Sequence, residues 1–167
     1  PEVAQQYSNQ FKYLMIDEYQ DTNHLQFKIA TALTSTHNNI CVVGDDDQSI
    51  YAFRGADLDN ILSFEKKFSG CKTIKLEQNY RSTSNILELA NKVIAENKNR
   101  KSKKLWSQKQ SENKPILWAM GNTDHEAEIV VEEILQQQNK GNQLKDIAVL
   151  YRSKTQTPPL EDQLRLS

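Results

Sequence analysis

The sequence predicts an α/β fold built on parallel strands. Apolar runs of strand length alternate with helical patterns three times within the first eighty residues, and a second strand–helix–strand unit follows. Such alternation is typical of parallel strands that are joined by helical crossovers. The 167 residues are enough for one ordinary domain or for two small pieces.

The first half of the chain contains three predicted strands with helices between them. Thr22 or Asn23 can cap the second helix, whose apolar residues include Leu25 and Ile29. Gly70 ends the third helix. The predicted strands are residues 13–17, 40–43 and 73–76, and the predicted helices are residues 2–10, 23–33 and 57–68.

A helix over residues 83–97 opens the second half. Residues 98–114 are rich in Lys, Asn, Ser and Gln, which predicts a solvated connector and a hinge, although the hinge can equally fall near Tyr80. The later elements are a strand over residues 116–120, a helix opened by a capping box at 123–126 and ended by Gly141, a strand over 147–151, and a last helix from Thr157.

The composition excludes several classes of protein. The net charge of −1 gives no generally basic surface, so any nucleic-acid contact has to come from a local groove. Cys41 and Cys71 are predicted to be buried thiols in a reducing cell, and the three histidines have no zinc-ligand spacing. No apolar stretch approaches 18 residues and no signal peptide is evident, so we expect a soluble protein in a bacterial-type cytoplasm, without membrane contact.

The stretch Leu14-Met15-Ile16-Asp17-Glu18 runs from a buried strand straight into two carboxylates. Ligands of open α/β sheets gather where the strands' carboxyl ends open into a crevice, and carboxylates can hold a metal ion there against a phosphate. In a second interpretation, Asp17 and Glu18 only cap the following helix. The octapeptide that ends at Asp21 does not decide between the two.

Two further polar stretches follow predicted strands, and parallel topology puts all three on one edge of the sheet. One runs from Gly44 through three aspartates to Gly55, and the other is Gln78-Asn79-Tyr80-Arg81-Ser82. Carboxylates, an amide and an arginine are the groups that phosphoryl transfer requires. Asp46 and Asp47 alternatively form a solvated turn, and aromatic residues such as Tyr51 and Phe53 are often part of a core.

The same three stretches resemble conserved motifs of the UvrD/Rep/PcrA-type superfamily 1 DNA helicases. The matching blocks are Asp-Glu-Tyr-Gln-Asp-Thr from Asp17, Val-Gly-Asp-Asp-Asp-Gln-Ser-Ile-Tyr-Ala-Phe-Arg-Gly-Ala from Val43, and Gln-Asn-Tyr-Arg-Ser from Gln78. Residues 146–152 are similar to the next motif of that family. The resemblance implies parts of two RecA-like (P-loop NTPase type) parallel-sheet domains, with residues 1–80 in the first and 81–167 in the second.

The resemblance also implies the activity and the site residues. It implies an ATP-dependent helicase that moves 3′ to 5′ on single-stranded DNA and unwinds duplex junctions, with ATP and Mg²⁺ as cofactors. The implied roles are Mg²⁺ binding through water for Asp17, activation of water for Glu18, γ-phosphate sensing for Gln48, adenine stacking for Tyr80, γ-phosphate contact for Arg81, and single-stranded DNA contact for Tyr51, Phe53 and Arg54.

Two departures from the family pattern limit what we expect of this chain by itself. Phe53 stands where tryptophan is common, which predicts weaker stacking on a base. No G-x-x-x-x-G-K-[ST] phosphate loop is present, and the chain starts Pro1-Glu2-Val3 without Met. We therefore expect a central helicase fragment that lacks its flanking segments and hydrolyses no ATP alone.

Two other functions stay open at this point. One is a non-enzymatic module that binds single-stranded nucleic acid through Tyr51, Phe53 and Arg54. The other is a metal-dependent nuclease that uses Asp17, Glu18 and Asp45. The sequence leaves the pathway, whether repair or replication, as well as the partner proteins, the duplex preference and the oligomeric state undetermined.

Overall fold

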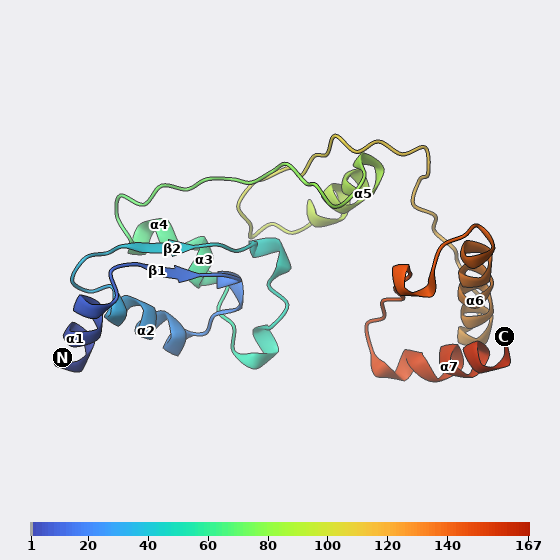
Figure 1. Ribbon diagram of the computed structural model, residues 1–167, viewed down its shortest axis with the longest axis horizontal. Helices are drawn as coiled ribbons and strands as arrows, with labels where there is room; N and C mark the ends of the chain where they lie inside the picture. Colours follow the sequence, from blue (N-terminus) through green and yellow to red (C-terminus); the bar gives the residue numbers. More distant parts are fainter. Residues whose placement is uncertain (1) are drawn as a thin grey trace. The chain divides into compact units, whose positions relative to one another are not determined.

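The computed structural model describes residues 2–167 and divides the chain into two compact units (Figure 1). The first unit extends to Pro115 and the second runs from Ile116 to Ser167. Helices combine with a pair of parallel strands, which confirms the predicted α/β class.

The sheet of the first unit consists of β1 (Leu14–Ile16) and β2 (Ile40–Val42). The two strands are parallel, with Leu14 opposite Ile40 and Ile16 opposite Val42. The backbone N–H of Val43 continues the ladder by donating to the Ile16 carbonyl at 2.8 Å. The residues that follow each strand, Asp17–Glu18 and Gly44–Asp45, therefore leave the sheet side by side at its carboxyl end.

The first unit also contains short helices. A capping box begins α2, in which the Asn23 side chain accepts from the Gln26 N–H while the Gln26 side chain accepts from the Asn23 N–H. The predicted helix over residues 57–68 is divided at Ser63 into two short helices. The helices of this unit are α1 (Glu2–Gln10), α2 (His24–Leu33), α3 (Asp59–Leu62), α4 (Phe64–Lys67) and α5 (Ser84–Ile94).

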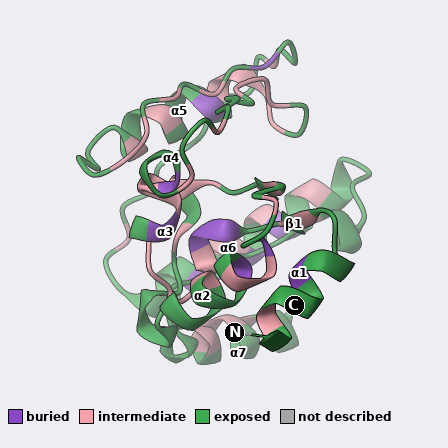
Figure 2. Ribbon diagram, turned by 90° about the vertical axis from the view of Figure 1, so that its left-hand side faces the viewer, coloured by how far each residue is buried: buried purple, intermediate pink, exposed green. Residues whose placement is uncertain are grey.

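The core of the first unit is small and partly polar. Figure 2 colours the few buried residues of the chain purple. Tyr19 is fully buried and meets Phe64 edge to face at 5.5 Å between ring centroids. Asn60 is also buried, and its Nδ2 donates to the Thr22 carbonyl at 3.1 Å. These contacts fasten the segment after β1 to α3 and α4.

The helix predicted after Asn23 forms as α2, but the face predicted to be buried is not the buried one. Asn23 caps the helix as expected, but Leu25 and Ile29 are 67% and 60% exposed, and Ala30 is the buried residue. The physical reason is that other positions of α2 face the rest of the first unit: Phe27 meets the Phe68 ring at 6.5 Å between centroids, and Ala30 is buried.

The three other predicted strands do not form. Residues 73–76, 116–120 and 147–151 match strand patterns, yet none has a partner strand within the described part of the chain. Ile74, Leu117 and Leu150 are accordingly 69%, 94% and 92% exposed. A strand exists only through hydrogen bonds to a neighbour, and β1 and β2 pair only with each other among residues 2–167.

The second unit consists of α6 (Thr123–Asn139) packed against α7 (Thr157–Leu166). Its buried apolar residues are Ala127, Val131 and Ile134 on α6. The predicted capping box at 123–126 is wrong by one residue, because Asn122 caps α6 by accepting from the His125 N–H at 2.8 Å. The helix ends before Gly141, whose φ of +93° fits the predicted stop.

The expectations about the cysteines and about membrane-spanning helices can also be compared with the structure. Cys41 and Cys71 are free thiols, but Cys41 is exposed and Cys71 is half-buried, so the prediction of buried thiols is wrong. Among the described residues, no helix is both long enough and apolar enough to cross a membrane.

Gly44 provides a test of how closely the two strand ends approach. A Cβ at this position would lie 2.5 Å from Gln20 Oε1 and 3.0 Å from the Tyr19 nitrogen. We expect Gly44→Ala to lower the free energy of unfolding by about 1–3 kcal/mol, because a methyl group has to displace buried neighbours. Urea denaturation measures this. Gly121→Ala is the matched control, since nothing lies within 4 Å of its Cβ; equal effects of the two substitutions would contradict the close approach.

Candidate nucleotide site and aromatic cluster

The site begins with a strained residue. Glu18 follows β1 with φ 48° and ψ 44°, the left-handed conformation that non-glycine residues rarely adopt. The Glu18 N–H donates to Asp17 Oδ1 at 2.9 Å, and the Tyr19 N–H donates to the Val43 carbonyl at 2.9 Å. Backbone strain of this kind costs about 1–3 kcal/mol and is concentrated at functional sites.

Asn23 caps α2, and Glu18, which stands at the cap position of the 3-10 turn over Tyr19–Asp21, makes no side-chain capping hydrogen bond there. The interpretation of Asp17 and Glu18 as simple helix caps is therefore wrong. Both residues are exposed at the carboxyl end of β1. Their carboxylates are available to solvent and to ligands.

Gln20 connects Glu18 to the end of β2. Its side chain is 1% exposed, and its Nε2 donates to Glu18 Oε2 at 2.7 Å. Its Oε1 accepts from the Asp45 N–H at 3.0 Å. One buried amide thus joins the two polar segments that leave the sheet.

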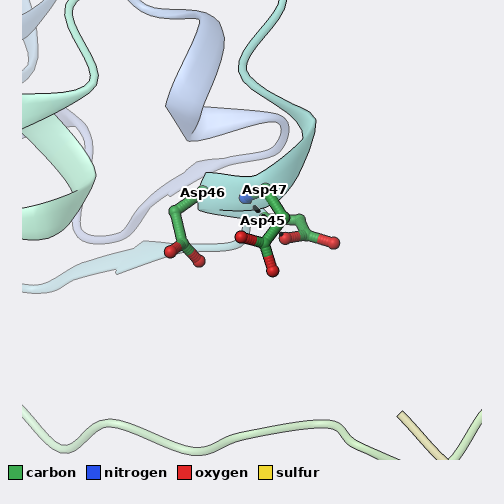
Figure 3. Close-up of side chains that lie close together, drawn as sticks. All are labelled: Asp45, Asp46 and Asp47. Carbon is green, nitrogen blue, oxygen red and sulfur yellow. Dashed lines mark hydrogen bonds between the residues drawn. The ribbon is translucent and has the colours of Figure 1, made fainter. Parts of the chain in front are cut away.

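The acid turn (Asp45, Asp46 and Asp47) follows β2 directly. Its three carboxylates extend to the same side of the turn (Figure 3). Asp45 Oδ1 accepts from the Asp47 N–H at 3.0 Å, and Asp45 Oδ2 accepts from Gln48 Nε2 at 2.8 Å. The Asp45 carboxylate therefore holds both the turn and the Gln48 side chain.

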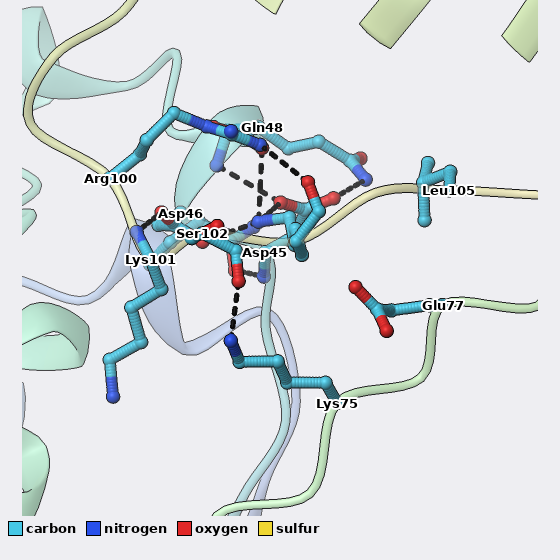
Figure 4. A network of polar contacts seen from close by, with 12 residues as sticks. Asp45, Asp46, Gln48, Lys75, Glu77, Arg100, Lys101, Ser102 and Leu105 are labelled. Atoms are coloured by element: carbon cyan, nitrogen blue, oxygen red, sulfur yellow. Dashed lines mark hydrogen bonds and ion pairs between the residues drawn. The ribbon is translucent and has the colours of Figure 1, made fainter. Parts of the chain in front are cut away.

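Two basic residues from the lysine-rich segment neutralise the acid turn (Figure 4). Arg100 binds Asp47 through two parallel bonds, Nε to Oδ1 at 2.8 Å and Nη2 to Oδ2 at 2.6 Å. Lys103 Nζ lies 2.6 Å from Asp45 Oδ1 and 3.1 Å from Asp47 Oδ2, and it also pairs with Asp46. The Lys101 N–H donates to Asp46 Oδ2 at 2.6 Å.

These contacts overturn two expectations. Residues 98–114 are not simply a solvated connector, because residues 100–103 bind the acid turn and the Trp106 N–H donates to the Glu77 carbonyl at 3.0 Å. Asp46 and Asp47 are not a solvated turn, since their side chains are only 5% and 11% exposed. Three adjacent carboxylates need cations, and the lysine-rich segment supplies them.

The pKa values of the cluster reflect this pairing. The Arg100 guanidinium, together with Lys103, holds the pKa of Asp47 below its usual value despite partial burial. Burial alone would raise the pKa of Asp45, but hydrogen bonds from Lys103 and Gln48 outweigh it and lower the pKa. Burial likewise opposes the charge of Lys103, yet the three carboxylates raise the pKa of its ammonium.

The same pairing separates two possible cation sites. Three carboxylates in close proximity suit a divalent ion, but in the acid turn Lys103 Nζ already lies among them. Asp17 and Glu18 differ, because no ion pair joins either to a basic side chain in the part of the chain that the structure describes. Asp17 and Glu18 are therefore the carboxylates at this edge whose charge no described basic side chain neutralises.

Tyr80 and Arg81 were expected to follow a third strand, which does not form. Both are exposed residues of the first unit. Tyr80 is 73% exposed, with its hydroxyl donating to Gln78 Oε1 at 3.0 Å. Asn79 Oδ1 accepts from the Arg81 N–H at 2.9 Å, and the Arg81 side chain is in solvent. Among residues 2–167, no hydrogen bond or ion pair joins Arg81 to Glu18 or Gln48. The structure brings together Glu18, Gln20, Asp45 and Gln48 and leaves the arginine apart.

A cavity of about 490 Å³ adjoins Gln48 in the first unit. Its polar lining comes from the acid turn and its partners, and its apolar lining comes from α5 and Leu105. A concave site that combines an apolar wall with a few polar groups suits a small ligand. The lining residues are Asp45, Asp47, Gln48, Ile86, Leu89, Ala90, Asn91, Val93, Ile94, Arg100, Lys103 and Leu105.

An exposed aromatic cluster follows the acid turn. The rings of Tyr51 and Phe53 lie 6.0 Å apart between centroids, and the Arg54 guanidinium carbon lies 5.3 Å and 5.4 Å from the two ring centroids. Phe53 is 78% exposed, so the interpretation of these aromatics as core residues is wrong. Two aromatic faces beside a guanidinium form a surface on which bases and phosphates can bind.

Gln20, Arg100 and Lys103 were not among the residues singled out in the sequence. Gln20 lies within the first matching block, where its burial gives no signal in the sequence. The signal for Arg100 and Lys103 was available in the three consecutive aspartates, since such a run requires nearby cations when it is buried.

Removing the Lys103 ammonium tests the cluster. We expect Lys103→Met to lower the free energy of unfolding at pH 7 by about 3 kcal/mol, the lower end for a buried pair that loses one partner. Lys104→Met is the control, because Lys104 is exposed and its side chain makes no hydrogen bond or ion pair among the described residues.

The effect of Lys103→Met should depend on pH. The lowered pKa values of Asp45 and Asp47 stabilise the wild type above the usual aspartate pKa of about 3.9, and this is lost as pH falls through the lowered values. In the variant, repulsion among the carboxylates raises their pKa values. Urea denaturation from pH 7 to pH 3 should therefore show the difference shrinking; a constant difference would contradict the ion cluster.

Comparisons with known proteins match both parts of the chain to helicase domains. Residues 1–69 match the UvrD/REP helicase N-terminal domain, and residues 74–167 match the UvrD-like helicase C-terminal domain. The chain is 48% identical over 162 residues to the ATP-dependent DNA helicases PcrA of Staphylococcus aureus and Staphylococcus epidermidis. The match covers 97% of the chain and 22% of the length of each relative. The chain belongs to the UvrD-like helicase family.

Proposed function

We propose that the chain is the central part of an ATP-dependent DNA helicase. The observation that carries this proposal is the linked set of Glu18, Gln20, Asp45 and Gln48 at the carboxyl end of the two parallel strands. The relatives named above are ATP-dependent DNA helicases, and the chain spans about a fifth of their length. We therefore attribute the activity to the longer protein and propose that the 167-residue chain hydrolyses no ATP alone.

The proposed nucleotide site assigns one role to each group. Asp17 holds Mg²⁺ through its water shell, and Glu18 accepts the proton of the attacking water. Gln48 contacts the γ-phosphate, Tyr80 stacks on the adenine, and Arg81 neutralises charge that develops on the transferred phosphoryl group. Mg²⁺ supplies charge neutralisation at the phosphates when it is bound.

The proposed division into domains follows the helicase pattern. Residues 1–80 form the C-terminal half of the first RecA-like domain and residues 81–167 the N-terminal part of the second. Arg81 then belongs to the second domain, so a nucleotide between the domains is what joins it to Glu18 and Gln48. The match to the N-terminal helicase domain ends at residue 69 and the match to the C-terminal domain begins at residue 74, which supports a division of the chain close to the proposed boundary.

The aromatic cluster is the proposed contact for single-stranded DNA. Tyr51 and Phe53 present stacking faces and Arg54 presents a cation to the backbone phosphate. We propose translocation from 3′ to 5′ and unwinding of duplex junctions, as in the family that the sequence resembles. A cytoplasmic location follows from a DNA substrate in a bacterial-type cell.

A metal-dependent nuclease is disfavoured by the acid turn. Such an enzyme would use Asp45 as a ligand together with Asp17 and Glu18, but the Asp45 carboxylate already accepts from Lys103 and Gln48. A purely DNA-binding module would leave the strained Glu18 and its buried Gln20 partner without a role.

Arg81 tests the proposed ATPase in the full-length helicase that contains this segment. We expect Arg81→Ala to lower kcat by about 10³–10⁵-fold, the range for an arginine that stabilises phosphoryl transfer. Steady-state phosphate release measures this, with Glu18→Gln as a second inactive variant and the purified 167-residue chain as the blank. Normal hydrolysis by both variants would refute the proposed site, and turnover by the 167-residue chain that is lost on Glu18→Gln would refute its inactivity.

Phe53 tests the proposed DNA contact in the same full-length protein. We expect Phe53→Ala to weaken binding of a labelled single-stranded oligonucleotide by about 1–3 kcal/mol, the value of one stacked base. Fluorescence anisotropy at fixed salt measures the affinity. Leu25→Ala, which removes another exposed apolar side chain, on α2, is the control, and equal affinities of the two variants would argue against stacking on Phe53.

A further inference from the structure

The lysine-rich segment joins two parts of the first unit through charge. Every hydrogen bond and ion pair described between residues 2–72 and residues 73–115 ends on the acid turn or on Glu65. The first part carries Glu18 and Gln48, and the second carries Arg81. Figure 4 shows the segment from Arg100 to Leu105 passing the acid turn, with Gln48 beside it.

We propose that Arg100 and Lys103 are positioning residues for Gln48. This inference rests on the proposed function, in which Gln48 contacts the γ-phosphate, and it adds residues outside the three stretches that the sequence singled out. No described hydrogen bond or ion pair joins Arg100 or Lys103 to Glu18 or Gln48. They act through the carboxylates of the acid turn.

The first step of the proposal concerns Asp45. Its carboxylate is the only described acceptor for Gln48 Nε2 within residues 2–167, at 2.8 Å. Lys103 Nζ binds the other oxygen of the same carboxylate at 2.6 Å. Without the ammonium, three neighbouring carboxylates repel one another, and Asp45 turns toward water and releases the Gln48 amide.

The second step concerns Asp47. The Arg100 guanidinium holds both oxygens of Asp47 in a planar fork, and the two side chains are only 15% and 11% exposed. The Asp47 N–H donates to Asp45 Oδ1, so the fork also fixes the carboxylate that holds Gln48. A lysine at this position keeps the charge but loses the paired geometry.

The position of Gln48 can be measured directly in the 167-residue chain by NMR. In the wild type, we expect the side-chain NH₂ signals of Gln48 to be shifted away from those of a solvated glutamine. Lys103→Met should return them to the solvated position, Lys103→Arg should keep them shifted, and the control Lys104→Met should leave them unchanged. If Lys103→Met does not fold, Arg100→Lys serves in its place, with a smaller shift in the same direction.

The catalytic consequence is measured in the full-length helicase. We expect Lys103→Met to lower kcat for ATP by about 10–100-fold, as for other residues that orient a contacting group, while KM for ATP is unchanged. Lys103→Arg should restore most of kcat, and Lys104→Met should match the wild type. A general loss of structure would instead raise KM and lower the fraction of active enzyme, which active-site titration reports.

The two experiments separate this inference from the proposed function. Unchanged Gln48 signals in folded Lys103→Met, or wild-type kcat in that variant while Glu18→Gln is inactive, overturns the positioning role alone. Shifted Gln48 signals that respond as expected, in an enzyme whose Glu18→Gln variant still hydrolyses ATP, uphold the positioning role and overturn the proposed ATPase site.

Discussion

Neutralisation of three consecutive carboxylates is the constraint on which the first unit depends. Asp45, Asp46 and Asp47 lie partly buried directly after β2, where unpaired charges would be costly. Arg100 and Lys103 remove that cost, and in doing so they bring a segment more than fifty residues away onto the end of the sheet. These ion pairs connect the turn that carries Gln48 to residues 73–115, which carry Arg81, within the first unit.

This pairing gives the two acidic segments at the sheet edge opposite characters. The acid turn is paired with cations of the chain itself, and its Asp45 also holds the Gln48 amide. Asp17 and Glu18 are exposed without basic partners among the described residues, and Glu18 adopts a strained backbone conformation. Gln20 links the two segments through a single buried amide.

Sequence patterns predicted the local elements better than the pairings. The Asn23 cap, the position of α5, the stop at Gly141 and the start of α7 at Thr157 depend on neighbours within a few residues, and they are found as predicted. The strand over 73–76 was predicted from alternation alone. It fails because strand formation requires a partner backbone, and neither β1 nor β2 pairs with it.

The sequence by itself determined the family, the α/β class and the motif residues, because these depend on the identity and order of side chains. Only the tertiary structure decided which carboxylates are free and which are paired. Asp17 and Asp45 are equivalent as residues in a motif, yet one is exposed and the other accepts from Lys103. The physical reason is that an ion pair between residues 45 and 103 depends on the path of the chain through space, which no local pattern encodes.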